Sequence, residues 1–152
     1  MVRAMDLDIV RRFAEELIPF NRFLGLRVLH VERGRVEMEI PWRAELIGDP
    51  MKPAVHGGVI STLADTAGGM AIWTALESPA QQRVSTIDLR IDYLRPGRPE
   101  ALVAEAVVVR AGRSVGVADI RVYQPSSRTE IIATGKGVYA IKTPRASAQV
   151  KQ

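Results

Sequence analysis

The stretch HGGVISTLADTAGGMAIWTALES, residues 56–78, decides how this chain folds. It predicts one long helix that opens at two glycines, carries Asp65 in its interior and ends near Ser78 and Pro79. Five of its residues are glycine or aspartate, and both types are poor helix formers inside a helix. Local helix stability does not explain their presence, so we interpret them as residues kept for chemistry.

The two sides of this helix differ in character. At about 100° per residue, one stripe is mostly small and contains the acid: Gly58, Ser61, Thr62, Asp65, Gly69 and Ile72. The opposite stripe is apolar and should face a sheet: Ile60, Leu63, Ala64, Ala67 and Ala71. Asp65 would then stand among small residues, where a ligand or another backbone can approach closely.

The segments on either side of this helix predict a helix and six strands. Residues 6–20 have the apolar spacing of a helix, which Pro19 should close. Strands are expected at 25–31, 35–41, 83–94, 101–110, 115–123 and 131–141, with a loop at 42–55. The turns between the last four strands are short, so neighbouring strands can pair antiparallel.

This order predicts an α+β fold, with one antiparallel sheet and the long helix packed on one of its faces. The chain has 152 residues, of which 47% are hydrophobic and 25% charged, so we expect one folded domain over residues 1–142. Residues 143–152 are polar and small, and we expect a flexible tail there.

Charge and aromatic content narrow the classes of function. The net charge is +4, and 17 of the 21 cationic side chains are arginines spread along the chain. Only 5% of the residues are aromatic, so the basic stripe and stacking platforms of a nucleic-acid-binding protein are missing. The arginines suit either a small polyanion, such as a nucleotide-bearing cofactor, or a solvated basic surface.

Targeting and redox features point to the cytoplasm. No apolar run approaches the roughly 18 residues of a membrane span, and residues 1–8 lack the apolar core of a secretion signal. The chain has no cysteine, which excludes disulfides and thiolate metal sites. We therefore expect a cytoplasmic protein with neither a membrane nor a nucleic-acid partner.

The start of the long helix offers an anion site. The first amides of a helix have no partner within the helix, and the helix dipole makes this end positive. Gly57 and Gly58 leave these amides uncovered, so they can hold an anion or a developing oxyanion. The alternative for the glycines is that they only permit a tight turn into the helix. The alternative for Asp65 is that it is a solvated acid, as a single aspartate on a helix usually is.

The spacing of these groups argues against a site within one helix. Gly57 and Asp65 are eight residues apart, or about 12 Å at a rise of about 1.5 Å per residue. A carbonyl group held at the Gly57 amide is then out of reach of Asp65. If both act on one substrate, they must come from two antiparallel helices, which predicts a two-fold dimer with two composite sites.

Three motifs resemble the PaaI-like branch of the hotdog-fold acyl-CoA thioesterases: ELIGDP at 45–50, HGGVISTLAD at 56–65, and TIDL with YLRPG within 86–97. The resemblance covers residues 19–141, and it implies a six-stranded antiparallel sheet wrapped around the long central helix. It also implies homodimers, usually paired into tetramers, that hydrolyse thioesters of coenzyme A.

The resemblance implies a role for individual residues. Gly57 matches the oxyanion-binding amide, and Asp65 of the facing subunit matches the acid that activates water or attacks the carbonyl carbon. Thr86 matches a hydroxyl that helps to hold the water, and His56 matches the side chain that positions the thioester. Asp49 matches a substrate-binding position that contacts the carbonyl group and where relatives mostly carry asparagine, but a carboxylate cannot donate a hydrogen bond unless it is protonated. A second carboxylate near the site could instead favour the protonated form of Asp65. Coenzyme A would be part of the substrate, so neither a separate cofactor nor a metal is implied.

One further motif has a different explanation. Residues 112–116 read GRSVG and match the G-x-S-x-G nucleophile elbow, but strand patterns flank them on both sides. Both histidines, His30 and His56, also precede the serine. We therefore predict a β-hairpin turn, from which Arg113 and Ser114 either reach the phosphates of coenzyme A or are solvated. We interpret His30 as structural.

Two rival functions are left by the sequence. One is a catalytically silent hotdog domain that binds acyl-CoA as a sensor or carrier, where the carboxylate of Asp65 would have little use. The other is a hotdog dehydratase or hydratase acting on β-hydroxyacyl thioesters. The acyl group, aromatic or aliphatic, stays open.

Overall fold

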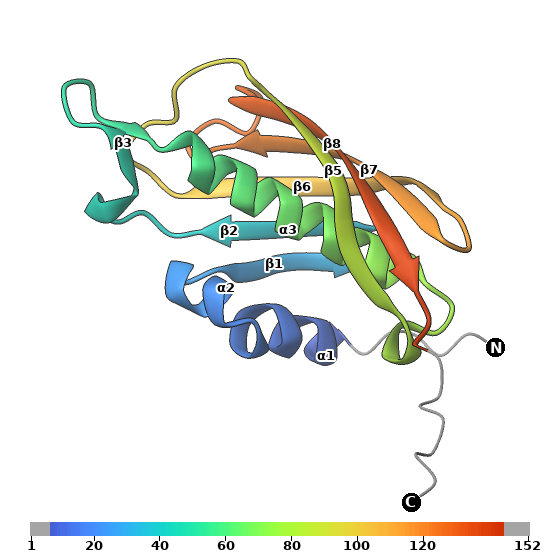
Figure 1. The fold of residues 1–152 in the computed structure, drawn as a ribbon. Helices are drawn as coiled ribbons and strands as arrows, with labels where there is room; N and C mark the ends of the chain where they lie inside the picture. Colours follow the sequence, from blue (N-terminus) through green and yellow to red (C-terminus); the bar gives the residue numbers. More distant parts are fainter. Residues whose placement is uncertain (1–6, 145–152) are drawn as a thin grey trace, which may run out of the picture.

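The computed structural model describes residues 7–144, whose largest element is one antiparallel sheet of six strands (Figure 1). The strands are β1 (Arg27–Glu32), β2 (Arg35–Ile40), β5 (Arg83–Tyr93), β6 (Leu102–Ala111), β7 (Val115–Tyr123) and β8 (Ala133–Lys142). Their order across the sheet is β1-β2-β6-β7-β8-β5. The six predicted strands are present, and the predicted α+β fold is confirmed.

The position of β5 differs from the expected pairing of neighbouring strands. β5 pairs along its length with β8 and not with β6. The expected short turn is part of an eight-residue connection, residues 94–101, which contains Pro96 and Pro99. This connection is long enough to cross the end of the sheet, so β5 becomes an edge strand with one free side in the described chain.

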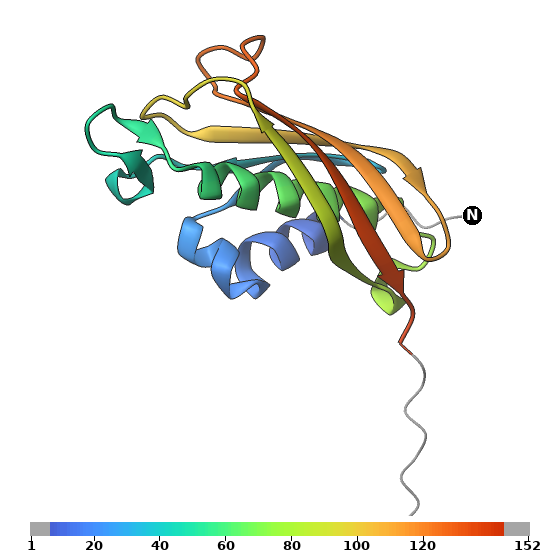
Figure 2. The ribbon, with the colours of Figure 1, turned by 45° about the horizontal axis from the view of Figure 1, so that its top comes forward.

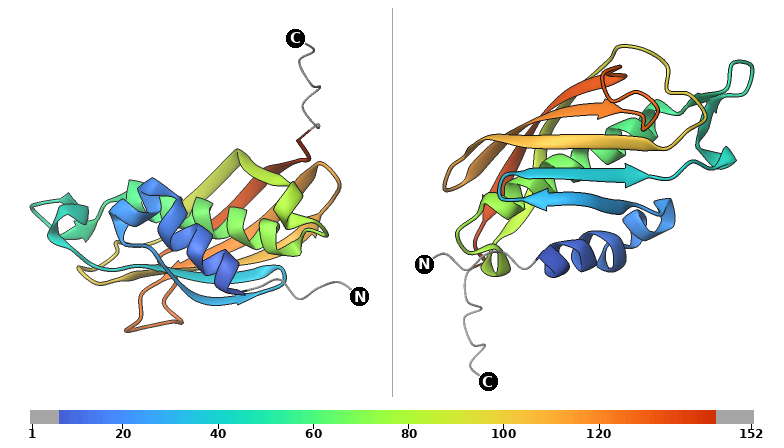
Figure 3. Two further views of the ribbon diagram at one scale, coloured as in Figure 1. Left: turned by 90° about the horizontal axis from the view of Figure 1, so that it is seen from below. Right: turned by 180° about the vertical axis from the view of Figure 1, so that it is seen from behind.

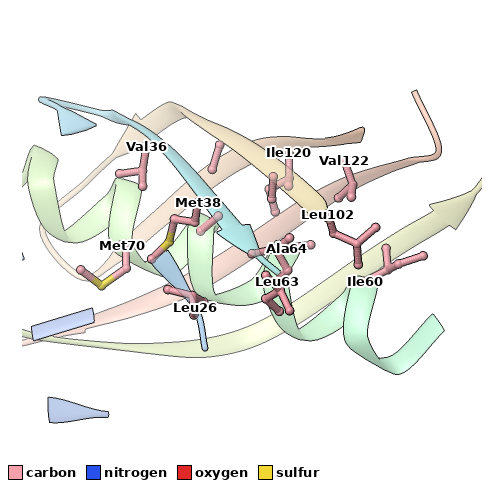
Figure 4. Close-up of a cluster of buried hydrophobic side chains, with 14 of the residues drawn as sticks. Leu26, Val36, Met38, Ile60, Leu63, Ala64, Met70, Leu102, Ile120 and Val122 are labelled. Carbon is pink, nitrogen blue, oxygen red and sulfur yellow. The ribbon is translucent and has the colours of Figure 1, made fainter. Parts of the chain in front are cut away.

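The predicted long helix is α3 (Gly57–Ala75), which lies across the concave face of the sheet (Figure 2). The stripe predicted to face the sheet is buried: Ile60, Leu63, Ala64, Ala67 and Ala71 are at most 3% exposed. They belong to a hydrophobic core shared with β2, β6 and β7, whose contributions include Val36, Met38, Leu102, Ile120 and Val122 (Figure 4). The prediction for this stripe is confirmed.

Two details of the helix differ from the prediction. α3 ends at Ala75, before Ser78, because Leu76 adopts an extended conformation and buries its side chain. Ile72 was expected on the small, accessible stripe, but it is fully buried. It fills the space above Gly116 of β7, where a Cβ atom would lie 2.7 Å from the Ile72 Cδ1. The curved sheet thus wraps further around the last turns of the helix than a straight stripe indicates.

Residues 7–24, here called the N-terminal segment, form three short helices instead of one. These are α1 (Leu7–Arg12), the π-helix η1 (Phe13–Leu17) and α2 (Pro19–Leu24). Pro19 closes the preceding helix as predicted, because Ile18 before it is extended (φ −90°, ψ 110°), but it also begins α2, where a proline removes no helical hydrogen bond. Gly25, at a φ of 69°, ends α2 in the left-handed conformation that favours glycine. The N-terminal segment runs beside α3 on the same side of the sheet (Figure 3, left).

The predicted loop at 42–55 is ordered by short elements of its own. It contains η2 (Ala44–Leu46) and a two-stranded sheet of β3 (Ile47–Asp49) and β4 (Ala54–Val55). The amide of His56 donates a hydrogen bond of 2.8 Å to the carbonyl oxygen of Leu46. The loop is thereby tied to the residue that precedes α3.

Parts of the predicted domain and tail lie outside the described residues. These are residues 1–6 of the domain and residues 145–152 of the tail, while β8 ends at Lys142 and is followed by coil at residues 143–144. Within residues 7–144, no helix is both long and apolar enough to cross a membrane.

Candidate active site

The first turn of α3 is arranged around His56. The Nδ1 atom of His56 accepts a hydrogen bond of 2.8 Å from the amide of Gly58. Its carbonyl oxygen accepts bonds of 2.9 Å from the amide of Val59 and 3.4 Å from that of Ile60. Within the described residues, the amide of Gly57 is then the one donor of this turn that has no acceptor. Both glycine amides were expected to bind a ligand, but the amide of Gly58 already donates its hydrogen bond to the side chain of His56.

The cap also determines which nitrogen of His56 carries a proton. A neutral imidazole has one N–H group, and Nδ1 acts here as an acceptor. The hydrogen therefore sits on Nε2, because the bond made by one ring nitrogen sets the tautomer. His56 thus keeps one N–H donor, at Nε2, in addition to its role in the helix cap.

Tyr93, at the end of β5, lies over this helix start, and no role was predicted for it. Its hydroxyl donates a hydrogen bond of 3.0 Å to the carbonyl oxygen of Gly57 and also contacts the hydroxyl of Ser61. A Cβ atom at Gly57 would lie 3.3 Å from the Cε1 atom of the Tyr93 ring. The ring therefore closes over the glycine and holds the Gly57 peptide in position.

Asp65 lies two turns further along α3 and contacts Thr86 of β5. The Thr86 hydroxyl donates a hydrogen bond of 2.8 Å to Oδ1 of Asp65, which orients the carboxylate. Oδ2 has no hydrogen-bond partner in the part of the chain described. Asp65 and Gly57 do not meet within one chain, since they are separated by about 12 Å along the helix axis.

Tyr139 of β8 reaches Asp65 from the buried side, and it was also missed from the sequence. Its hydroxyl donates a hydrogen bond of 3.1 Å to the backbone carbonyl oxygen of Asp65. Burial, and then the charge of Asp65, raise the pKa of Tyr139 well above its usual value, so the phenol stays protonated and remains a donor. A Cβ atom at Gly68 would overlap the Tyr139 hydroxyl. Gly68 therefore makes room for a tyrosine of the core and was wrongly interpreted as a residue kept for chemistry.

Asp49 has a local role in the loop before α3. Its carboxylate accepts hydrogen bonds of 2.9 Å from the amide of Met51 and 3.3 Å from that of Lys52. These contacts need an acceptor and no proton, so an acid serves this turn well. The carbonyl oxygen of an asparagine side chain could accept the same two bonds, so this turn fits either residue.

Arg113 and Ser114 lie in the hairpin turn between β6 and β7, as predicted, and the G-x-S-x-G motif is not a nucleophile elbow. Arg113 borders a cavity of about 500 Å³ at the C-terminal end of α3, together with Arg33. This cavity is separate from the one that Asp65 borders. The structure thus does not bring Arg113 to Asp65 within one chain.

His30 lies on β1, with 47% of its side chain exposed and its Nε2 3.8 Å from a carboxylate oxygen of Glu32. It borders none of the cavities described here. In the described part of the chain, no group of three or more histidine, aspartate or glutamate side chains is placed to hold a metal ion.

A cavity of about 750 Å³ opens beside Asp65 and Thr86. Its walls come from α3, from the beginning of β5 and from the N-terminal segment. The carboxylate that Thr86 orients therefore faces a space large enough for a small organic molecule.

The fold of this chain is the hotdog fold of thioesterases. A family model described as the thioesterase superfamily matches residues 53–131, a range that contains His56, Asp65 and Thr86. The chain belongs to the thioesterase superfamily and is a thioester hydrolase, and the resemblance to PaaI-like hotdog thioesterases is confirmed.

Individual relatives support the same family. VNG_1336C of Halobacterium salinarum is 41% identical over 124 residues, which cover 78% of this chain and 82% of that protein. The medium/long-chain acyl-CoA thioesterase YigI of Escherichia coli is 35% identical over 117 residues, covering 70% of this chain and 76% of YigI. A crystal structure of a thioesterase-related protein from Shewanella oneidensis has a TM-score of 0.80 at 30% identity, covering 90% of this chain and 95% of that one.

Proposed function

We propose that this protein hydrolyses a coenzyme A thioester to a free acid and coenzyme A, with Asp65 of one subunit and the Gly57 amide of the other. The observation that carries this proposal is the first turn of α3, where the Gly57 amide has no acceptor among the described residues. An oriented donor at the positive end of a helix suits a carbonyl oxygen that gains negative charge. The name of YigI supports coenzyme A as the carrier of the acyl group.

The composite site needs two chains, and β5 offers the surface to join them. Its outer edge is free in the described chain, and Ile87 and Leu94 expose 58% and 54% of their surface on or next to this strand. Two β5 edges that pair across a two-fold axis would extend the sheet and bring two α3 helices together antiparallel. We therefore propose a homodimer, or a dimer of such dimers.

The reaction follows from the donors and the acid of this site. The thioester carbonyl oxygen accepts hydrogen bonds from the Gly57 amide and from Nε2–H of His56. Asp65, oriented by Thr86, takes a proton from a water molecule while the water oxygen bonds to the carbonyl carbon. The carbon–sulfur bond then breaks, and the thiolate of coenzyme A takes up a proton. Direct attack by the Asp65 carboxylate would use the same geometry and form an anhydride that water then hydrolyses.

The phosphates of coenzyme A need cationic or hydroxyl partners away from the reacting carbon. We assign them to Arg113 and Ser114, and Arg33 adds a second guanidinium on the same cavity as Arg113. Gly58 keeps a supporting role, because its amide holds His56 in place. Coenzyme A enters as part of the substrate.

Thiol release from a panel of acyl-CoA thioesters tests the activity. We expect turnover by the wild type and loss of nearly all turnover in Asp65→Asn, with an unchanged circular dichroism spectrum. A wild type that binds these thioesters without releasing thiol would support the acyl-CoA-binding alternative. Retained turnover in a clean Asp65→Asn preparation would overturn the assignment of Asp65.

A proline at position 57 tests the amide alone. Position 57 is the first residue of α3, where proline is well tolerated, and His56 already has the extended conformation that precedes proline (φ −60°, ψ 130°). Gly57→Pro removes the N–H donor and should lower kcat about 100-fold to 1,000-fold. Gly57→Ala places a similar Cβ atom under Tyr93 but keeps the donor, so it should retain most of the activity.

Mixed subunits test whether the site is composite. Gly57→Pro and Asp65→Asn subunits, unfolded together and refolded at equal amounts, should recover about one quarter of the wild-type activity. The reason is that half of the dimers are then mixed, and one of their two sites has both native groups. No recovery in a mixture shown to contain mixed dimers would overturn the composite site.

A further inference from the structure

The 750 Å³ cavity beside Asp65 continues along α3 away from that residue. Besides Asp65 and Thr86, it is bordered by Gly69, Met70 and Trp73 on successive turns of the same helix. Trp73 is eight residues beyond Asp65, or about 12 Å along the axis. The cavity is therefore elongated, with the proposed reacting group at one position and an aromatic side chain two turns further on.

The lining changes from polar to apolar over this distance. Near Asp65 it contains hydroxyl side chains, those of Thr62, Thr66 and Thr86, while further along it contains Met70, Trp73 and Phe13. The indole N–H of Trp73 already donates a hydrogen bond of 2.9 Å to the carbonyl oxygen of Pro79, so its ring offers an apolar surface. The polar exceptions are Gln82 and Arg83, which precede or begin β5, and Asn21 of α2. The side-chain amide of Asn21 already donates a hydrogen bond of 2.9 Å to the carbonyl oxygen of Ala14. This gradient suits a ligand with a polar reacting group and an apolar extension.

The far part of the cavity is closed by the N-terminal segment. Phe13 packs on Trp73, with ring centroids 5.2 Å apart. The segment runs in the direction opposite to α3 (Figure 2), and Phe20, seven residues after Phe13, borders the same cavity. Phe13 and Phe20 border the cavity and remain 40% and 55% exposed. Their exposed apolar surface would be covered by a ligand in the cavity.

We propose that this cavity binds a straight aliphatic acyl chain of about eight to ten carbons, with Phe13 and Trp73 marking its far end. The proposal rests on the thioesterase function proposed above and specifies its acyl group. Carbon–carbon bonds are about 1.5 Å long, so an extended chain advances about 1.3 Å per bond and about nine bonds span 12 Å. A benzoyl group would fill only the part nearest Asp65. The N-terminal segment lies outside residues 53–131, so the wall of the cavity that contains Phe13 comes from a part of this protein that the family model does not include.

A series of straight-chain acyl-CoA thioesters from two to fourteen carbons tests this proposal. We expect kcat/KM of the wild type to be highest at eight to ten carbons. Gly69→Leu places a side chain in the cavity one turn beyond Asp65, and it should lower the ratio of kcat/KM for decanoyl-CoA to that for butanoyl-CoA at least tenfold. A Cβ atom at Gly69 meets Tyr139 only at 3.5 Å, so the helix itself accepts a side chain there.

A second variant opens the cavity in place of blocking it. Phe13→Ala removes the ring that packs on Trp73, and it should move the preferred length by two or more carbons toward longer chains. Phe23→Ala is the matched control, because Phe23 belongs to the same segment, is 67% exposed and does not border the cavity. It should leave the preference for chain length unchanged.

The outcomes separate this proposal from the proposed function. Hydrolysis with a flat or aromatic preference, or with a profile that neither Gly69→Leu nor Phe13→Ala changes in folded protein, overturns the cavity assignment alone. If no thioester is hydrolysed, the dissociation constants of the same series of thioesters test the cavity assignment. Binding that tightens about fourfold per added carbon up to about ten carbons supports the cavity assignment, and binding independent of length overturns it.

Discussion

The hydroxyl of Tyr139 donates a hydrogen bond of 3.1 Å to the backbone carbonyl oxygen of Asp65. A residue of β8 thereby determines how close α3 lies to the sheet at the turn that carries the acid. The tyrosine reaches this carbonyl group because residue 68 has no side chain. The position of Asp65 thus depends on a contact with the buried side chain of Tyr139 as well as on its exposed partner Thr86.

The two central glycines of α3 should respond oppositely to alanine. Gly68→Ala would place a Cβ atom on the Tyr139 hydroxyl, and we expect it to lower the free energy of unfolding by about 1–3 kcal/mol. Gly69→Ala meets Tyr139 at an ordinary 3.5 Å, and it should raise this free energy by about 0.5–1 kcal/mol. Urea unfolding followed by circular dichroism measures both. Shifts of the same sign would contradict the assignment of Gly68 to Tyr139.

Thr86 should matter through its hydroxyl group. Thr86→Val keeps the shape of the side chain but removes the donor to Asp65, so the carboxylate loses its orientation and kcat should fall about 10-fold to 100-fold. Thr86→Ser keeps the donor and should stay within about threefold of the wild type. Steady-state thiol release gives these values. Equal losses in both variants would show that the methyl group, not the hydroxyl, is what the site needs.

His56 should combine a structural and a chemical role that two substitutions can separate. His56→Ala removes the cap on Gly58 and should cost about 1 kcal/mol of stability. His56→Asn restores a capping acceptor, so its melting temperature should approach that of the wild type, while the Nε2–H donor is lost. We expect low activity in both variants. Full activity in His56→Asn would reduce His56 to a helix cap.

Tyr123 should make the protein sensitive to high pH. Its side chain is 3% exposed and donates a hydrogen bond of 2.9 Å to Glu37. Burial, and then the hydrogen bond to Glu37, raise the pKa of Tyr123 to about 12, while an unfolded tyrosine titrates near 10. Between these values the unfolded chain has lost the proton and the folded chain has not, so stability falls as pH rises, by up to about 1.4 kcal/mol per pH unit.

The control for this pH dependence is Tyr123→Phe, in which Tyr139 still contributes its own loss at high pH. Its free energy of unfolding should fall less steeply than that of the wild type between pH 10 and 12. Chemical denaturation at several pH values checks the difference. Parallel curves for the two proteins would contradict the role of Tyr123.

Much of the fold follows from local pattern, because periodicity reports burial directly. The apolar stripe from Ile60 to Ala71 is where the prediction places it, since a helix on a sheet buries one face. The pairing of β5 with β8 was not predictable in the same way. Which strand β5 pairs with depends on the path of the connection between β5 and β6 in space. The composition of residues 94–101 does not show whether this connection makes a tight turn or crosses the end of the sheet.

The site was predictable where one motif carries several groups, as in residues 56–65. Tyr93 and Tyr139 were missed because each acts on a residue far away in the sequence. The signal for Tyr139 was present in Gly68, since a glycine inside a helix often marks a close approach. A single sequence does not say whether a ligand or a tyrosine makes that approach.

The bond between His56 and Gly58 also limits which anions the enzyme can take up. Inorganic phosphate and sulfate settle at helix starts by engaging several adjacent amides at once. The amides of Gly58, Val59 and Ile60 already donate to His56. The Gly57 amide can therefore bind one oxygen atom, but in the part of the molecule that the structure describes the helix start has no further free amide for a second oxygen of the same anion. Inorganic phosphate should therefore compete poorly with a thioester carbonyl oxygen for this position.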